Sequence, residues 1–300
     1  MYVNLEEQQV LDILNELLEK YDNKGAREVR DGHTRVSVFG KQLRFDLSKS
    51  FPLLTHRQFF MRGIFEELMW MLRGQTDNKI LEDKNVRIWS PWNNIMDQNN
   101  PTDMGLIYGH QWRNFGEVRM KGHSFKKHIE DTRWSYENDI AQKGFDQIEW
   151  LLNEIKTNPN SSRLIVSGWN PNDIPKAVLP CCHTLFQFFV EDGKLSCQLY
   201  QRSSDISLAG GFNIAQYALM THFIAQQCDL EVGEFIWTLG DVHLYGNQID
   251  DVREMVSRHT NAFPQIEIIK AKDLYSYEWE DITIKNYTHS GRMGALKVAV

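Results

Sequence analysis

The spacing of hydrophobic residues along the chain changes several times, and each spacing predicts a different element. In residues 5–21 apolar side chains recur every three or four positions after Asn4, a residue type that often caps helices, so we expect an amphipathic helix. Residues 61–72 and 146–155 have the same spacing and predict two more helices. Residues 212–228 are almost continuously apolar, which indicates a helix buried in the core.

Other segments have the shorter period of strands. We expect residues 35–47 to form two short strands around Gly40-Lys41, and residues 184–201 to form a hairpin that turns at Asp192-Gly193. Further strands are expected at 163–169, 235–239, 265–269 and 281–284. Because helices and strands mix without regular alternation, and no repeat of fixed period appears, the pattern favours an α+β fold over a doubly wound sheet.

Composition adds limits to this picture. With 300 residues, 42% of them hydrophobic, and no Gly/Ser-rich or Pro-rich linker, the sequence predicts one large domain over residues 1–300. The first residues lack the basic start and apolar run of a signal peptide, and no stretch approaches the ~18 apolar residues of a membrane span. We therefore expect a cytoplasmic protein without a membrane segment.

Charge and cysteine content narrow the choice of ligand. A net charge of −7 argues against broad nucleic-acid binding, which depends on basic surface, but a small phosphorylated ligand needs only a few arginines in one pocket. The four cysteines include no C-x-x-C pair, so we expect a reducing compartment and no metal site.

The segment Pro180-Cys181-Cys182-His183 and the segment that begins at Gln201-Arg202 carry the most chemistry, because the predicted hairpin joins them. A thiol attacks as the thiolate, and a nearby guanidinium favours that form, so a cysteine facing an arginine across a sheet indicates covalent catalysis. An isolated Cys-His pair is more often an unreactive part of the core. The residues that follow decide between the two interpretations.

Those residues resemble the signature of thymidylate synthases, a family that also includes pyrimidine nucleotide hydroxymethylases. The signature segments are Cys197-Gln198-Leu199-Tyr200-Gln201-Arg202-Ser203, Asp205, Phe212-Asn213-Ile214-Ala215-Gln216-Tyr217 and Gly240-Asp241-Val242-His243-Leu244-Tyr245. The resemblance covers nearly the whole chain and includes Arg30-Asp31-Gly32, Trp89, Trp92, Tyr108-Gly109-His110-Gln111-Trp112-Arg113 and residues 163–170. Residues 114–142 are polar, are expected to be irregular in structure, and look like an insertion relative to short bacterial members, so we expect them on the surface.

The resemblance implies a mixed, twisted sheet with helices on one face and the partner subunit of a homodimer on the other. It also implies conversion of dUMP to dTMP, with 5,10-methylenetetrahydrofolate as the donor of both the carbon and the hydride. Two alternatives stay open. A hydroxymethylase would stop after methylene transfer and add water, and a non-catalytic nucleotide- or RNA-binding paralogue would have no need for Cys182, Glu67, Arg202 and Asn213 together.

The reaction that the resemblance implies assigns roles to individual residues. Carbon 5 of uracil is a poor nucleophile, so a thiolate must first add at carbon 6. We expect Cys182 to be that thiolate and Cys181 to pack in the core. Glu67 lies on the apolar face of the 61–72 helix, where a carboxylate is costly unless functional, and is expected to relay a proton near oxygen 4. Glu66 is expected to face solvent. The other implied catalytic residues are Tyr108, His183, Arg202 and Asp205.

Binding roles follow in the same way. Asn213 is expected to read the base, because an amide offers both the donor and the acceptor that uracil requires, and this favours dUMP over dCMP. His243 and Tyr245, two positions apart on an expected strand, resemble the pair that binds the ribose 3′-hydroxyl. The implied phosphate ligands are Arg30, Arg202, Ser203 and, from the partner subunit, Arg163. The implied folate contacts are Trp89, Trp92, Asp205, Leu208, Ala209, Phe212 and Val300.

Several positions depart from the family pattern. Ser162 stands where the family has the first of two arginines, and His33 or Arg35 is a candidate replacement for the missing cation. Ala209 adds a methyl group toward the folate. Gly210-Gly211 replaces a proline-containing sequence, so we expect a looser loop there. Phe60 and the altered tail at 294–297 also fall in the expected folate region.

Overall fold

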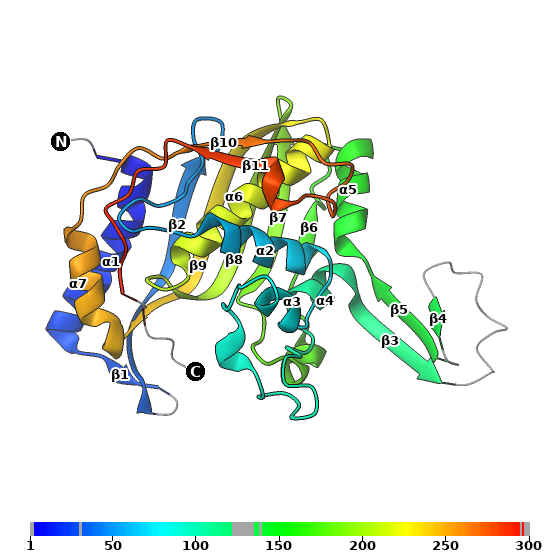
Figure 1. The fold of residues 1–300 in the computed structure, drawn as a ribbon, viewed down its shortest axis with the longest axis horizontal. Coiled ribbons are helices and arrows are strands. Elements are labelled where there is room, and N and C mark those ends of the chain that lie inside the picture. The colour runs from blue at the N-terminus through cyan, green and yellow to red at the C-terminus, as the bar shows by residue number, and fades with distance from the viewer. Residues whose placement is uncertain (1–2, 30–31, 122–134, 138–139, 295, 297–300) are drawn as a thin grey trace.

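The computed structural model describes residues 3–29, 32–121, 135–137, 140–294 and 296. Arg30 and Val300, both predicted to bind ligands, lie outside the described residues, as do Ala295 and Lys297 of the altered tail. Helices and strands of the described part pack around one mixed sheet (Figure 1), so the predicted α+β class is confirmed.

The central sheet has six strands in the order β1-β2-β9-β8-β7-β6. Neighbouring strands run antiparallel except β8 and β9, which are parallel. Their bounds are β1 Arg27–Glu28, β2 Thr34–Asp46, β6 Ile165–Ser167, β7 His183–Glu191, β8 Lys194–Asp205 and β9 Glu231–Tyr245. A separate ribbon pairs β10 Gln265–Ile268 with β11 Ile282–Lys285.

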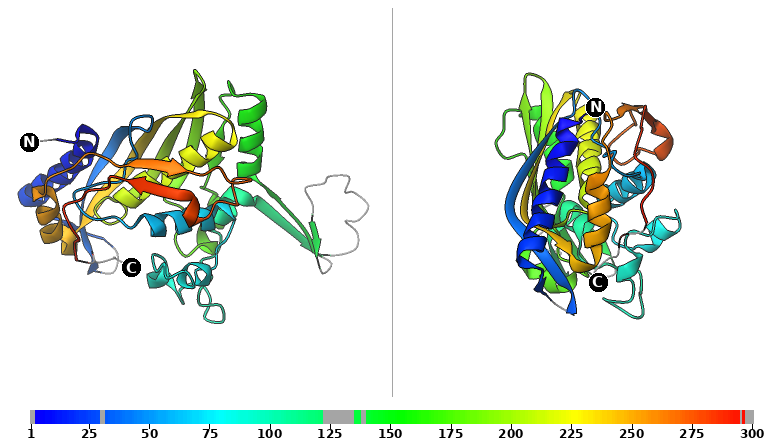
Figure 2. Two further views of the ribbon diagram at one scale, coloured as in Figure 1. Left: turned by 45° about the horizontal axis from the view of Figure 1, so that its top comes forward. Right: turned by 90° about the vertical axis from the view of Figure 1, so that its left-hand side faces the viewer.

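Helices cover one face of this sheet (Figure 2, right). Most side chains of α6 (Gly210–Gln227) are buried, as its apolar sequence predicts, and the helix packs on β8 and β9 with α2 (Met61–Leu72) beside it. The other helices are α1 Leu5–Lys24, α3 Lys79–Glu82, α4 Tyr108–Arg113, α5 Gln147–Thr157 and α7 Ile249–Ser257. Of the described helices, none has the combined length and apolar character that crossing a membrane requires.

Local sequence accounts for several of these bounds. The Asn4 side chain accepts hydrogen bonds from the backbone N–H groups of Glu6 and Glu7, so α1 begins where the cap was predicted. The hairpin of β7 and β8 turns at Asp192 and Gly193, whose φ angles of 49° and 74° are both positive, as a type I′ turn requires.

The prediction of two short strands around Gly40 is wrong, because β2 is one continuous strand paired with β9 on both sides of that glycine. Gly40 has a φ of 75°, which lets the strand bend without ending. Opposite this bend, a Cβ on Gly240 would lie 2.8 Å from the carbonyl oxygen of Arg202, so strands β8 and β9 approach too closely for any side chain there.

The prediction that residues 114–142 are irregular is also wrong for the part that the structure describes. β3 (Phe115–Lys121) and β5 (Ile140–Phe145) pair antiparallel, with β4 (Ser135–Glu137) on the far side of β5. This ribbon projects from the main body at the right of Figure 1, in agreement with the predicted surface position. Whether it is an insertion stays a prediction.

The face of β6, β7 and β8 that points away from α6 is uncovered and partly apolar. Side chains of Ile165, Leu185, Phe189 and Tyr200 are 36–58% exposed there, whereas the alternate residues Phe186 and Phe188 are buried under α6. Adjacent exposed apolar side chains on a flat sheet are a common mark of a protein interface.

Candidate active site

Cys182 and Arg202 meet at the start of the β7–β8 hairpin, where His183 pairs with Gln201. The Arg202 Nη2 lies 3.8 Å from the Cys182 Sγ. Backbone carbonyl groups also hold the guanidinium. The same Nη2 donates to the Pro180 carbonyl at 2.7 Å, and Nε donates to the Cys181 carbonyl at 3.1 Å. These bonds fix the cation beside the sulfur.

The Tyr108 hydroxyl completes the surroundings of this thiol. It accepts the backbone N–H of Cys182 at 2.9 Å and also hydrogen-bonds the sulfur. Burial raises the pKa of the Cys182 thiol, and Arg202 and Tyr108 act in the opposite direction. Cys181 is buried and makes no such hydrogen bond to a hydroxyl, and its thiol pKa is raised by burial and by the neighbouring cysteine. Of the two, Cys182 has the surroundings of a nucleophile.

Glu67 lies on α2 and is 8% exposed. Its carboxylate accepts hydrogen bonds from the Trp89 Nε1 at 2.7 Å and from the Gln216 Nε2 at 2.9 Å. Burial nevertheless raises the pKa of Glu67 to about 7, because neither donor carries a charge. A carboxyl group with this pKa can take up and release a proton at neutral pH.

The expectation that Glu66 faces solvent is wrong. Its side chain is 6% exposed and accepts a hydrogen bond from the Lys84 Nζ at 2.6 Å. The helical spacing could not reveal this, because Lys84 comes from a loop that α2 meets only in the folded chain.

His183 and Asn213 lie next to each other beyond the thiol. The His183 ring is 4% exposed between the rings of Tyr108 and Tyr217, and burial lowers its pKa to about 3, so the imidazole is neutral. The Asn213 side chain acts in the opposite direction and raises the pKa of this imidazole. Its Nδ2 donates to the Gln201 Oε1 at 3.2 Å.

Gln201 sets the orientation of that amide. The Gln201 Oε1 also accepts a hydrogen bond from the Trp237 Nε1–H at 2.9 Å. Because the indole N–H is only a donor, the Gln201 oxygen faces it, and Asn213 therefore turns its Nδ2 toward the same oxygen. An amide has two N–H groups and an oxygen with two lone pairs, so Asn213 keeps both donor and acceptor capacity for a ligand. Gln201 and Trp237 were not singled out from the sequence, although a glutamine at a buried strand position is a usable sign of such a network.

His243 is held by a chain of charged groups. Its Nδ1 lies 3.0 Å from the Asp241 Oδ1, and the Asp241 Oδ2 accepts from the Arg35 Nη2 at 2.8 Å. The hydrogen bond with His243 and the positive charge of Arg35 lower the pKa of Asp241, although burial acts in the opposite direction. The Nε2 of His243 is thereby left for a ligand, next to the Tyr245 ring at 5.2 Å. Arg35 is paired with this carboxylate, and whether His33 or Arg35 replaces the missing phosphate cation stays a prediction.

Comparison with known proteins decides what this arrangement belongs to. Residues 8–300 match the family model described as thymidylate synthase. The chain belongs to the thymidylate synthase family. One similar curated protein is the bifunctional dihydrofolate reductase-thymidylate synthase of Paramecium tetraurelia, which is 38% identical over 302 residues. The match covers 98% of this chain and 62% of that relative, so the chain spans less than two thirds of its length.

In this thymidylate synthase-like chain, Asp205 stands at the turn that leads into α6. Its Oδ1 accepts from the Ser207 hydroxyl at 3.0 Å and the Leu208 N–H at 3.1 Å, and its Oδ2 accepts from the Gln248 Nε2 at 2.7 Å. A carboxylate has about four lone-pair positions, so acceptor capacity remains for a ligand such as a pterin N–H.

The aromatic residues expected on the folate side divide into two groups. Trp89 is 5% exposed and bound to Glu67, so it supports the carboxylate, while Trp92 is half-buried with its ring 5.6 Å from the Trp89 ring. Phe212, in the first turn of α6, meets the Phe59 ring edge-on at 5.6 Å. Leu208 and Ala209 are half-buried beside it.

Arg57 belongs to this region but was not predicted. Its Nη2 donates to the carbonyls of Ser207 at 2.9 Å and Leu208 at 3.1 Å, and its guanidinium lies 4.3 Å from the Phe59 ring centre. Burial lowers its pKa to about 10. Arg57 therefore fixes the segment before α6 and places a cation beside it.

The expectation of a loose loop at Gly210-Gly211 is wrong. Both residues lie inside α6, and a Cβ on Gly211 would fall 2.3 Å from the Phe59 ring. Glycine is required at 211 by close packing rather than by flexibility.

Of the expected phosphate ligands, Arg202 and Ser203 are neighbours on β8, and Arg163 is exposed just before β6. Within the described ranges, Arg163 has no ion-pair partner. No group of three or more His, Cys, Asp or Glu side chains in the described part of the chain is placed to hold a metal ion. The absence of a metal from the reaction stays a prediction.

Proposed function

We propose that this chain converts dUMP to dTMP, with 5,10-methylenetetrahydrofolate as the donor of one carbon and a hydride. The contact of 3.8 Å between the Cys182 Sγ and the Arg202 Nη2 carries the proposal, because it joins a nucleophile to a cation that favours its ionised form. The family match over residues 8–300 supports it.

In this proposal the Cys182 thiolate adds to carbon 6 of the pyrimidine, which makes carbon 5 nucleophilic. Glu67, with its pKa near neutrality, exchanges a proton at oxygen 4. Neutral His183 packs against the Tyr108 ring, and both residues take part in removing the proton from carbon 5. Asn213, oriented by Gln201, selects uracil.

The sugar and phosphate complete the nucleotide site. His243 and Tyr245 bind the ribose 3′-hydroxyl, with His243 oriented by Asp241. Arg202 and Ser203 bind the phosphate together with Arg30 and with Arg163 of a second subunit. We place the folate against Trp92, Phe212, Leu208 and Ala209, with Asp205 on the pterin, Trp89 behind Glu67 and Val300 in the closing C-terminus.

We further propose a homodimer that forms through the uncovered face of β6, β7 and β8. The exposed apolar side chains on this face would be buried there, and Arg163 at its edge, exposed and without an ion-pair partner in the described residues, would reach the neighbouring phosphate site. The cytoplasmic location remains a prediction.

The alternative of hydroxymethylation rests on departures at Ala209, at Gly210-Gly211 and in the tail at 294–297, which bear on whether water reaches the intermediate. Of these, Gly210 and Gly211 are packed inside α6 and do not form a loose loop. Tight packing beside the folate region favours hydride transfer over hydration of the intermediate.

Product analysis of one reaction mixture tests the proposal. A synthase yields dTMP and dihydrofolate, whereas a hydroxymethylase yields 5-hydroxymethyl-dUMP and leaves tetrahydrofolate. A parallel incubation with 5-fluoro-dUMP and methylenetetrahydrofolate should give a covalent adduct, detected by intact-protein mass spectrometry. The adduct should be absent from Cys182→Ser and retained in the control Cys181→Ala. Absence of an adduct from the parent protein would refute the assignment.

A further inference from the structure

Gln248 lies between the two sides of the proposed site and hydrogen-bonds to both of them. It ends the short turn Gly246–Gln248 that follows β9, and its side chain is buried. Its Oε1 accepts the backbone N–H of Tyr245 at 3.0 Å, on the ribose side. Its Nε2 donates to the Asp205 Oδ2 at 2.7 Å, on the folate side. One amide therefore joins the end of β9 to the turn before α6.

The partners of Gln248 determine which way its amide points. The Tyr245 N–H can only donate, so it faces the Gln248 oxygen, and the Ser207 hydroxyl lies 3.2 Å from the same oxygen. The NH2 group is therefore turned toward the Asp205 carboxylate, which accepts. A glutamate at 248 would offer two acceptors and a methionine neither group, so this pair of partners suits glutamine.

A simpler explanation is that Gln248 only caps the turn. The bond from its side chain to the Tyr245 N–H closes residues 245–248 in the manner of a capping box. That explanation does not extend to the second bond, which crosses to Asp205, 43 positions earlier in the chain. A variant that keeps the acceptor and loses the donor can separate the two roles.

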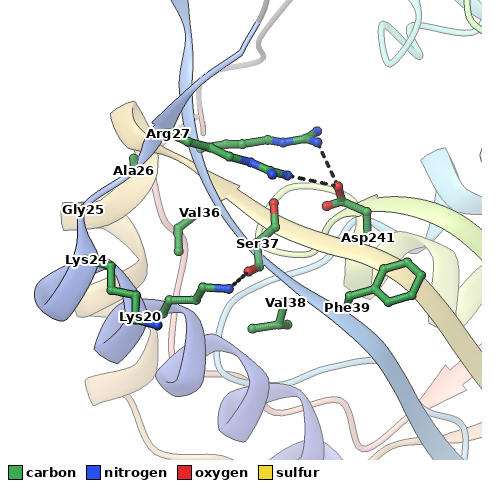
Figure 3. A pocket seen from close by; sticks show the side chains of 11 residues that line it. Lys20, Lys24, Gly25, Ala26, Arg27, Val36, Ser37, Val38, Phe39 and Asp241 are labelled. Atoms are coloured by element: carbon green, nitrogen blue, oxygen red, sulfur yellow. Dashed lines mark hydrogen bonds and ion pairs between the residues drawn. The ribbon is translucent and has the colours of Figure 1, made fainter.

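The second ribose residue, His243, has a support of its own. Its Nδ1 is held by Asp241, and Figure 3 shows the Asp241 carboxylate beside the guanidiniums of Arg35 and Arg27. These charges support His243, whereas Gln248 supports the neighbouring Tyr245 and also reaches the folate side.

The bond from Gln248 differs from the other bonds that hold Asp205. The Ser207 hydroxyl and the Leu208 N–H, which donate to Oδ1, belong to the same turn as Asp205 and move with it. The Gln248 Nε2 instead ties the carboxylate to β9. Because a ligand that bridges both sides needs these groups at a fixed separation, the bond to Gln248 is the one that matters for geometry.

We propose that Gln248 is a positioning residue for both ligands of this site. Through Asp205 it orients the acceptor for the pterin, and through the Tyr245 backbone it fixes the end of β9 that binds the ribose. This inference rests on the proposed function, which assigns the pterin to Asp205 and the ribose to Tyr245.

Calorimetry on the full chain tests the assignment, with dUMP titrated alone and tetrahydrofolate titrated at saturating dUMP. Gln248→Glu keeps an oxygen toward Tyr245 but replaces the NH2 group that Asp205 needs. The Kd of tetrahydrofolate should rise about tenfold or more, while the Kd of dUMP stays within about threefold. The KM for methylenetetrahydrofolate should rise in the same way with little change in kcat. Gln248→Met loses both bonds, so both ligands should bind more weakly.

Gln147→Glu is the matched control. Gln147 is also buried and uses both ends of its amide, donating to the carbonyls of Gln111 and Ser167 and accepting the Ser167 N–H, in contacts between α5 and β6. Its replacement should lower thermal stability and leave both Kd values unchanged. Circular dichroism verifies that each variant is folded.

Three results would each overturn the inference. In the first, Gln248→Glu binds tetrahydrofolate as tightly as the parent. In the second, it weakens dUMP and tetrahydrofolate equally, as a general loss of structure would. In the third, Gln147→Glu gives the same split between the two ligands. A parent protein that binds neither ligand would instead refute the proposed function, and this inference with it.

Discussion

Glu67 shows how one buried side chain links stability to chemistry. Trp89 and Gln216 satisfy both carboxylate oxygens with neutral donors, so burial still determines its proton affinity. The pKa rises from an ordinary 4.5 to about 7, which means that the folded protein holds this proton more tightly than the unfolded chain. Stability is therefore lost as pH rises from about 4.5 through 7.

We expect Glu67→Gln to abolish turnover and to stabilise the fold above neutral pH. The amide keeps the shape of the side chain but carries no charge to bury. The gain in unfolding free energy, relative to the parent, should grow by about 2 kcal/mol between pH 5.5 and pH 8. Urea denaturation at the two pH values measures it.

Glu66→Gln is the matched control, because it changes the neighbouring carboxylate. Glu66 is paired with Lys84, so its replacement should lower stability and should not give the pH-dependent gain. A gain of the same size in both variants would contradict the role assigned to burial of Glu67.

At the scale of elements, the beginning of α6 decides the shape of the proposed folate side. Gly211 lets Phe59 pack directly on the helix backbone, and Arg57 binds the carbonyls of Ser207 and Leu208 just before it. Phe212 then meets the Phe59 ring. The segment before α2 and the start of α6 thus form one packed unit, which explains the glycine at position 211.

We expect Gly211→Ala and Gly210→Ala to behave differently. The new methyl group at 211 would overlap the Phe59 ring, so thermal unfolding should show a loss of about 1–3 kcal/mol and the KM for the folate should rise. At 210 the nearest atom is the Ile206 Cγ1 at 3.1 Å, so a shift of a few tenths of an ångström makes room for the methyl group, and alanine favours helix. Stability should therefore change by less than about 1 kcal/mol. Equal effects at both positions would contradict the packing argument.

At the scale of the whole molecule, the two faces of the sheet have different roles. The face covered by α6 forms the hydrophobic core, and the opposite face of β6, β7 and β8 is the proposed dimer contact. Arg163 lies at the edge of that contact, whereas Cys182 lies at the start of β7. If the dimer forms as proposed, each active site contains residues of both chains.

Mixing two inactive variants tests this arrangement. Cys182→Ala and Arg163→Ala should each lack activity alone, yet subunit exchange should restore it. In the hybrid, one site combines an intact Cys182 with an intact Arg163 from the partner. We expect recovery of up to roughly a quarter of parent activity, since half the dimers are hybrid and each has one complete site. Absence of recovery, with exchange verified by native mass spectrometry, would contradict a shared site.

Local sequence determined much of this protein by itself. The helix at 61–72, the cap at Asn4 and the turn at Asp192-Gly193 were predicted correctly, because each depends on neighbours a few residues away. The ordered motifs also predicted the family, which the comparison confirmed. The roles of the individual site residues remain predictions.

Only the tertiary structure decided which partners the polar residues meet. Helical spacing placed Glu67 on the apolar face of its helix and Glu66 toward solvent, but it could not show that Lys84 pairs with Glu66 or that Trp89 and Gln216 bind Glu67. These three partners come from other segments of the chain. The continuity of β2 through Gly40 likewise depends on β9, which supplies partners on both sides of the bend. Burial, hydrogen-bond partners and hence pKa values are properties of packing between segments, and spacing along one segment does not contain them.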